Sequence, residues 1–258
     1  MTGAGESAVA ARSGAQSLER ALAVLDCFET EPDLRVTQLA RALDLSVSTT
    51  HRLLRALCRG GLVAQDAGSG RYRLAARTVV LGSLASRRLG LDAAQPVLEH
   101  LAAETGEGVV LGILDGAHSL VVSCAPGRRD DGVTVTRGQR GAVHACAMGK
   151  TLLAFDEDAE GRQPLARITP RTITDPTVLA LQLNRVRERG WAANDEELVL
   201  GVRGVSVPVF DADGRVCAAL AVAVPTGRLS RAHFPRTAHV LRSSAEQLHG
   251  LLPRSLPA

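Results

Sequence analysis

The stretch VTQLARALDLSVSTTHRLLRALCRGGLV, residues 36–63, decides the fold of the N-terminal part of the chain. Its first apolar-patterned segment predicts a short helix over Gln38–Leu43. After a two-residue connection, Ser46 is a favourable cap for a second helix that runs to about Arg59 and stops at a glycine pair. Another helix is predicted upstream over Ser17–Glu29, which has one apolar face. Two short helices joined by a tight turn are typical of a helix-turn-helix.

The helix that begins at Ser46 has two unlike faces. At about 100° per residue, Thr50, Leu53, Leu54 and Leu57 gather on one side. The other side and its flanks carry hydroxyl, imidazole and guanidinium groups, which are able to bind base edges and phosphates in a major groove. The alternative is that arginines on an exposed helix face are merely solvated. The residues predicted to contact DNA on this helix are Ser46, Ser48, Thr49, His51, Arg52, Arg55 and Arg59.

A hairpin is expected directly after this helix. Leu62–Gln65 and a second strand pattern flank the turn sequence Asp66–Gly70. This is the position of a wing, and Arg71 and Tyr72 on the returning strand are predicted to meet phosphate or the minor groove. Residues 35–73 hold seven arginines against two acidic residues, a local net charge of +5. A basic segment in a near-neutral chain indicates an anionic partner, here double-stranded DNA.

Composition bounds the class of protein. A chain of 258 residues, 45% of them hydrophobic, is long enough for two domains with their own cores. Residues 1–15 lack an apolar region and are expected to form a disordered tail, not a signal peptide. No apolar run approaches the roughly 18 residues of a membrane span, so no membrane partner is expected. The five cysteines have no metal-type spacing, which favours a reducing cytoplasm and predicts neither a metal site nor a cofactor.

Four segments are expected along the chain. They are the tail, a winged helix-turn-helix over 16–75, a helical linker over 76–105, and an α+β domain over 106–258. Pro96 lies inside the linker and is expected to kink or break its helix. In the last segment, strand patterns alternate with helical ones around a mostly antiparallel sheet. The expected strands are Val109–Leu114, Ser119–Ser123, Val133–Arg137, Val202–Phe210 and Val216–Val224, and the expected helices are His144–Phe155, Leu179–Arg189 and Arg236–Leu251.

Several motifs, in order, cover the chain from Ser17 to about Ser230. The N-terminal ones are SLERALAVLDCF, the helix-turn-helix stretch quoted above, and GRYRLAART. The C-terminal ones are LAAETGEGVVLGILDG, HACAMGKTLLA, RERGWAANDEELVLGVRGVSVPVFDADGRVCAAL and VPTGRLS. With these motifs the chain resembles the IclR family of transcriptional regulators. The resemblance implies a winged helix-turn-helix, a linker helix, a GAF-like effector-binding domain, and a homodimer or homotetramer on a near-palindromic operator.

The resemblance also implies where a small-molecule effector would bind. Family pockets are lined by the helix start after the HA pair, the acidic segment, the strand after it, and the last strand. Some family members hold small carboxylates with serines and a cysteine at positions where this chain has Ala221, Ala223 and Gly204. These small apolar walls favour a ligand with one polar end and an apolar body, unless the alanines are ordinary core. The implied effector-binding residues are Cys146, Ala147, Met148, Asn194, Asp195, Val202, Gly204, Ala221 and Ala223.

Two other classes of function compete with that of a ligand sensor. Catalysis by His144 and Cys146 is disfavoured because residues two apart do not face each other on a helix, so no catalytic residue is predicted. The sequence AMGKT lacks the first glycine of a phosphate-binding loop. The second alternative is a DNA-binding protein whose C-terminal domain only oligomerises. The effector, the operator, the sign of regulation and the choice of dimer or tetramer stay open at this stage.

Overall fold

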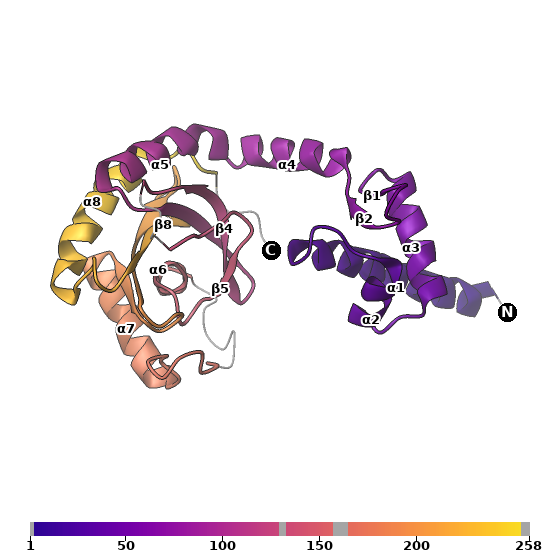
Figure 1. Cartoon of the computed structure of the whole chain (residues 1–258). Coiled ribbons are helices and arrows are strands. Elements are labelled where there is room, and N and C mark those ends of the chain that lie inside the picture. The colour runs from indigo at the N-terminus through magenta and orange to yellow at the C-terminus, as the bar shows by residue number, and fades with distance from the viewer. Residues whose placement is uncertain (1–2, 129–132, 157–164, 254–258) are drawn as a thin grey trace. The chain divides into compact units, whose positions relative to one another are not determined.

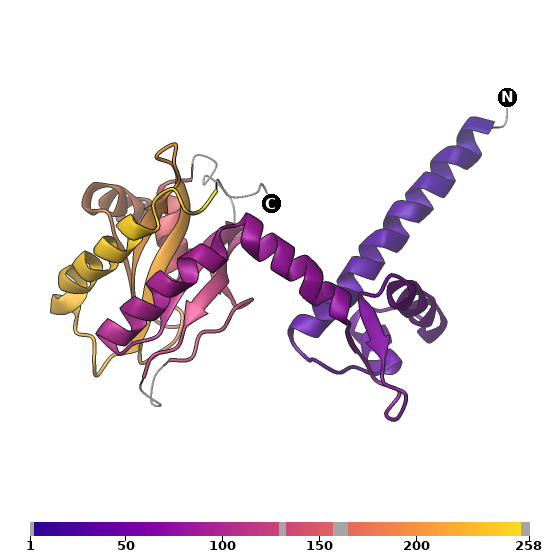
Figure 2. The ribbon, with the colours of Figure 1, turned by 90° about the horizontal axis from the view of Figure 1, so that it is seen from above.

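The computed structural model describes residues 3–128, 133–156 and 165–253 (Figures 1 and 2). The chain divides into two compact units, Met1–Ala85 and Ser86–Ala258. Each unit has its own cluster of buried hydrophobic side chains. The two units are therefore described separately.

The first unit is a helical domain with a small hairpin (Figure 1). Val24, Phe28, Leu39 and Leu54 are among the buried side chains where its helices meet. The hairpin strands pair antiparallel, which confirms the predicted winged helix-turn-helix. The elements are α1 (Gly3–Asp26), a 3-10 turn (Cys27–Glu29), α2 (Val36–Ala42), α3 (Val47–Arg59), β1 (Val63–Gln65), β2 (Tyr72–Leu74) and α4 (Ala76–Arg88).

The N-terminal residues differ from the expected disordered tail over 1–15. The structure begins helix α1 at Gly3, well before the apolar pattern that starts at Ser17. Five of the first fifteen residues are alanine, the residue with the highest intrinsic helix propensity. The segment therefore extends a helix whose C-terminal half is fixed by packing of Val24, and by Phe28 in the 3-10 turn that follows.

The second unit is built on a six-stranded sheet with strand order β5-β4-β3-β8-β7-β6, in which every neighbouring pair is antiparallel. This arrangement confirms the predicted α+β class. The strands are β3 (Val109–Asp115), β4 (His118–Ala125), β5 (Arg140–Ala142), β6 (Ala192–Asp195), β7 (Val202–Phe210) and β8 (Val216–Pro225). The helices are α5 (Leu91–Thr105), α6 (Ala147–Ala154), α7 (Pro176–Arg189) and α8 (Phe234–Gln247), with a 3-10 turn at Arg231–His233.

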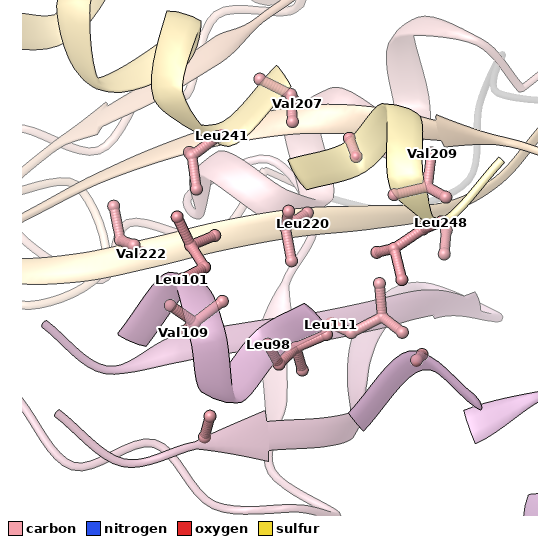
Figure 3. Close-up of a cluster of buried hydrophobic side chains, with 14 of the residues drawn as sticks. Leu98, Leu101, Val109, Leu111, Val207, Val209, Leu220, Val222, Leu241 and Leu248 are labelled. Carbon is pink, nitrogen blue, oxygen red and sulfur yellow. The ribbon is translucent and has the colours of Figure 1, made fainter. Parts of the chain in front are cut away.

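Helices cover both faces of this sheet. On one face α5 and α8 lie side by side (Figures 1 and 2). Their leucines meet the inward residues of the strands, as Figure 3 shows for Leu98 and Leu101 of α5, Leu241 of α8 and Leu220 of β8. On the other face α6 packs against β3, β7 and β8, and α7 packs against α6. Alternate residues of a strand therefore face two different environments.

Close approach of α6 to the sheet depends on glycine. A Cβ atom built on Gly112 of β3 would lie 2.1 Å from the sulfur of Met148 and 2.9 Å from the carbonyl oxygen of Leu120. Because Gly112 has no side chain, Met148 at the start of α6 can lie directly against β3.

Two expectations for the second unit are corrected, and one strand was not predicted. The expected strand Val133–Arg137 is absent, since these residues form irregular chain and a turn, and the strand beside β4 is β5 instead. The short edge strand β6 was not anticipated. Pro96 lies inside α5 without ending it, because buried residues on both sides of it pack on the sheet. The helical linker is interrupted earlier, at Gly90, whose φ is +68° and whose Cβ would lie 2.2 Å from the carbonyl oxygen of Leu251.

Candidate nucleic-acid interface and ligand cavity

The start of α3 is held by Ser46. Its hydroxyl oxygen accepts a hydrogen bond from the backbone N–H of Thr49 at 3.2 Å, as expected for an N-cap. The same hydroxyl lies 2.9 Å from the hydroxyl of Thr49 and 3.1 Å from that of Ser48. Three hydroxyl groups therefore gather at the helix N-terminus, where a recognition helix meets base edges.

The two faces of α3 are as different as the sequence predicts. Thr50, Leu53, Leu54 and Leu57 are buried against the first unit's core. The outer face is exposed and has no acidic residue within the helix. In the described part of the chain, the guanidinium groups of this face form no hydrogen bond or ion pair. The exposed side chains of this face are Ser48, His51, Arg52, Arg55 and Arg59, and Thr49 is half-buried.

The two residues of the wing that were predicted to contact DNA, Arg71 and Tyr72, lie in different surroundings. The Arg71 guanidinium donates a hydrogen bond to the backbone carbonyl of Asp33 at 2.8 Å, which ties the hairpin to the loop before α2. Tyr72 is only 3% exposed and belongs to the core, so its prediction as a DNA contact is wrong. In a strand of three residues, burial of Tyr72 turns its neighbour Arg73 outward, where it is exposed. Arg73 is thus the missed surface cation of the wing.

A cavity of about 120 Å³ lies between α6 and the sheet of the second unit. Eight of the nine residues predicted to bind an effector line it, from Cys146 at the start of α6 to Ala223 on β8. The lining also includes residues that sequence reasoning missed, from β3, β4, β5 and the loop after β6. The predicted lining residues are Cys146, Ala147, Met148, Asn194, Val202, Gly204, Ala221 and Ala223; those missed include Val110, Ser119, Val121, Arg140, Leu198 and Val199.

Polar groups in the cavity wall form hydrogen bonds with neighbouring residues of the protein. The hydroxyl of Ser119 lies 3.2 Å from the thiol sulfur of Cys146, which accepts a hydrogen bond from the backbone N–H of Gly149. Burial raises the pKa of the Cys146 thiol above its ordinary value, which opposes formation of a thiolate. The Asn194 side-chain oxygen accepts from the backbone N–H of Glu197 at 2.8 Å. These groups leave a mostly aliphatic cavity with a few fixed polar atoms.

Asp195 is the one predicted residue that does not line the cavity. Its carboxylate binds Arg203 at 2.7 Å and also pairs with Arg231 and, at 3.8 Å, with Arg171. Neighbouring residues of a strand point to opposite faces, so when Asn194 faces the cavity Asp195 cannot. Its prediction as an effector contact is therefore corrected to a role in an ion-pair network.

The arrangement around His144 does not form a catalytic pair. The ring Nε2 of His144 lies 3.0 Å from the backbone carbonyl of Ala166, whereas the thiol of Cys146 contacts Ser119. Among residues 3–128, 133–156 and 165–253, no group of three His, Cys, Asp or Glu side chains is placed to hold a metal ion. Across the same residues, no helix has both the length and the apolarity needed to cross a membrane.

Comparison with protein families decides the identity of both units. The first unit matches the IclR helix-turn-helix domain over residues 17–67. Residues 84–249 match the C-terminal domain of the bacterial transcriptional regulator IclR. The chain belongs to the IclR family. This confirms the resemblance seen in the sequence and makes the chain a transcriptional regulator with a DNA-binding unit and an effector domain.

Named relatives extend over nearly the whole of this IclR regulator. It is 34% identical to the HTH-type transcriptional regulator BhcR of Paracoccus denitrificans, over 93% of this chain and 89% of BhcR. It is 36% identical to XynR of Escherichia coli, over 85% of this chain and 90% of XynR. A solved IclR homologue from Microbacterium hydrocarbonoxydans, in complex with 4-hydroxybenzoate, is 25% identical, with a TM-score of 0.79 over 92% of this chain and 97% of its own.

The cavity residues of this IclR regulator that the sequence did not predict were missed for one reason. Ser119 and Val121 alternate along β4, and Val110 lies on β3, which pairs with both β4 and β8. Period-2 alternation predicts that such residues share a face, but not that the face is the one beneath α6. Pairing of strands distant in sequence was the missing information.

Proposed function

We propose that this regulator binds a near-palindromic operator as a homodimer or homotetramer, and that a small molecule in the second unit changes its operator affinity. The observation that carries the proposal is the exposed basic face of α3. Among the residues that the structure describes, Arg52, Arg55 and Arg59 are exposed and form no hydrogen bond or ion pair. Guanidinium groups bind guanine and phosphate bidentately. One winged helix-turn-helix makes few contacts, so two copies on symmetric half-sites are required for specificity.

Binding of the full chain to the DNA upstream of its own gene tests this proposal. Fluorescence anisotropy at physiological salt, followed by footprinting, should give one protected site with two half-sites spaced by whole helical turns. A scrambled duplex of the same length and composition is the control. Equal affinity for both duplexes would contradict the proposal.

The cavity supports a ligand about the size of one aromatic ring. Its volume is about 120 Å³, and an engineered apolar cavity of about 150 Å³ in another protein holds benzene. Ser119, Cys146 and Asn194 offer polar atoms within otherwise aliphatic walls. The complex of a relative with 4-hydroxybenzoate supports the same class of ligand. The proposed effector is therefore a small organic acid with an apolar body.

A thermal-shift screen tests the ligand class. 4-Hydroxybenzoate, benzoate and short aliphatic acids are added to the full chain, and any acid that raises the melting temperature is then titrated into the operator complex. Typical allosteric coupling of ~1–3 kcal/mol changes operator affinity about 5- to 150-fold. An acid that binds the cavity without changing operator affinity would favour the alternative that this unit only oligomerises.

Helix α4 supports the homo-oligomer. None of its residues is buried within the chain, and its large apolar side chains are half or more exposed at Val79, Val80 and Leu84. On α1 of the same unit, Leu18 and Leu22 are exposed as well. Apolar stripes of this kind are usually covered by another chain. The proposed occupant is a second copy of the chain.

A non-enzymatic role in the cytoplasm completes the proposal. The buried, protonated Cys146 thiol has no base within hydrogen-bond reach among its described contacts. Operator binding requires the compartment that holds the DNA. A turnover assay with small esters tests the first point, since hydrolysis lost in Cys146→Ala would reveal an enzyme.

A further inference from the structure

A buried ion pair lies directly behind the cavity. The Lys150 ammonium lies 2.7 Å from a carboxylate oxygen of Glu197, and the two side chains are 1% and 7% exposed. Lys150 follows the lining residue Met148 in α6, and Glu197 precedes the lining residues Leu198 and Val199. The pair therefore joins the α6 wall of the cavity to the wall formed by the loop between β6 and β7.

Neighbouring side chains fix the backbone of the same loop. The Thr172 hydroxyl donates to the carbonyl of Glu197 at 2.7 Å, and the Thr169 hydroxyl donates to the carbonyl of Glu196 at 2.8 Å. Glu196 has a φ of +65°, which is uncommon for a residue other than glycine. Such a conformation persists only where its surroundings over-determine it. The loop is thus held in one position at several points.

Stability alone does not account for the pair. Burial lowers the pKa of Lys150, although the nearby carboxylate opposes the shift. In the described part of the chain, the second carboxylate oxygen of Glu197 has no hydrogen-bond partner. Apolar side chains of similar volume often give equal or greater stability than a buried pair of charges. What the pair supplies is a fixed distance between the two elements that it joins.

We propose that Lys150 and Glu197 are positioning residues of the ligand cavity. Their contact holds the Leu198–Val199 wall against the wall that begins at Cys146, and so sets the size of the cavity and access to it. This inference rests on the proposed ligand-binding function of that cavity. Its test needs no ligand, because Cys146 lines the cavity and the residue is only 9% exposed.

The test measures how fast methyl methanethiosulfonate modifies each native cysteine of the full chain, by mass spectrometry of peptides. Cys217 is the internal reference, since it is buried in the core on the opposite face of the sheet. In Lys150→Met/Glu197→Leu we expect Cys146 to react about tenfold faster relative to Cys217, because local opening replaces global opening. The double variant removes both the Lys150 charge, which lowers the pKa of the Cys146 thiol, and the Glu197 charge, which raises it, so the two effects on the thiol oppose each other.

A matched control and a milder variant sharpen the result. Glu107→Gln/Arg228→Met removes another ion pair of the second unit, with a 2.8 Å contact outside the cavity, and should leave the Cys146 rate unchanged. Thr172→Val removes one hydroxyl that holds the loop and changes no charge. This milder variant still tests the inference if the double variant does not fold. It should accelerate Cys146 about threefold.

The inference is overturned if both loop variants leave the ratio of Cys146 to Cys217 rates at the wild-type value. Equal acceleration of the two cysteines would overturn it as well, because it would mean general loosening of the unit. A wild-type chain that binds none of the acids in the screen counts against the proposed function, and not against the positioning role.

Discussion

The hydroxyl of Ser119 and the thiol of Cys146 lie 3.2 Å apart in the wall of the cavity. Ser119 belongs to β4, and Cys146 is the N-cap of α6, whose side chain accepts from the backbone N–H of Gly149. The contact therefore joins the sheet to the start of the helix. A ligand hydroxyl or carboxylate that enters the cavity meets partners that are already oriented.

Ser119→Ala should weaken binding of the best acid from the screen about two- to tenfold, since one net hydrogen bond contributes roughly 0.5–1.5 kcal/mol. Isothermal titration calorimetry measures the change. Ser123→Ala is the matched control, because the hydroxyl of Ser123 bonds to Gln95 and lies outside the cavity. Equal losses in the two variants would mean that the effect is structural.

Ala221→Phe should abolish the response to the acid and leave operator affinity unchanged. A phenyl ring occupies space comparable to the whole cavity of about 120 Å³, and overpacking typically costs ~1–3 kcal/mol of stability, which the unit should tolerate. Anisotropy with and without the acid measures the response, and circular dichroism checks the fold. Ala212→Phe adds the same ring at the exposed β7–β8 turn. A normal response in Ala221→Phe would place the ligand elsewhere.

Arg52→Ala and Arg55→Ala should each weaken operator binding by ~1–3 kcal/mol if the guanidinium contacts a base, or flatten the salt dependence by about one unit if it contacts a phosphate. The measurement is anisotropy over a series of salt concentrations. Arg185→Ala removes the same charge from an exposed position on α7 in the second unit. Wild-type affinity in both α3 variants would show that this face does not bind DNA.

Val80→Glu/Leu84→Glu should shift the chain toward monomer at micromolar concentration, because charges four residues apart would be buried together in a shared apolar interface. Sedimentation velocity gives the distribution of species. Gly82→Glu, in the same helix on a different side, has open space around it and serves as the control. A wild-type chain that is monomeric with and without operator would refute the homo-oligomer.

Asp195→Asn should lower stability near neutral pH and have little effect in acid. Burial raises the pKa of Asp195, but the hydrogen bonds from Arg203 and Arg231 outweigh it and leave the pKa below its ordinary value. A lowered carboxyl pKa contributes stability above the unfolded value of about 3.9, and that stability is lost as the pH falls through the folded value. Urea unfolding at about pH 7 and in steps down to about pH 1 tests this, with Asp213→Asn at an exposed turn as the control. A pH-independent difference would exclude the ionised pairs as its cause.

Local patterns predicted the parts of the fold that local interactions decide. The N-cap at Ser46 and the opposed faces of α3 follow from a helix's own geometry, and both agree with the structure. Tyr72 was misassigned because a strand of three residues carries too short a pattern to show which side is buried. The helix breaks at Gly90 and not at Pro96; Gly90 has a φ of +68° and lies so close to Leu251, more than 150 residues away, that no Cβ atom fits, and no local pattern contains that contact.

The cavity residues that were predicted differ from those that were missed in the same way. Its residues on α6, β7 and β8 lie in motifs that the family carries, and those positions were predicted from the resemblance. Ser119 was missed because it reaches the cavity only through pairing of β4 with β3 and β5. Asp195 was misplaced by a single residue of strand alternation, which reverses the direction of a side chain.

The buried ion pair also changes what reagents and enzymes can do to the chain. Lys150 is the only lysine in the sequence, and its side chain is 1% exposed. Acetylation of a lysine, or coupling of an amine-reactive dye to one, therefore requires the second unit to open first. The extent of such labelling at Lys150 therefore measures how often that opening occurs.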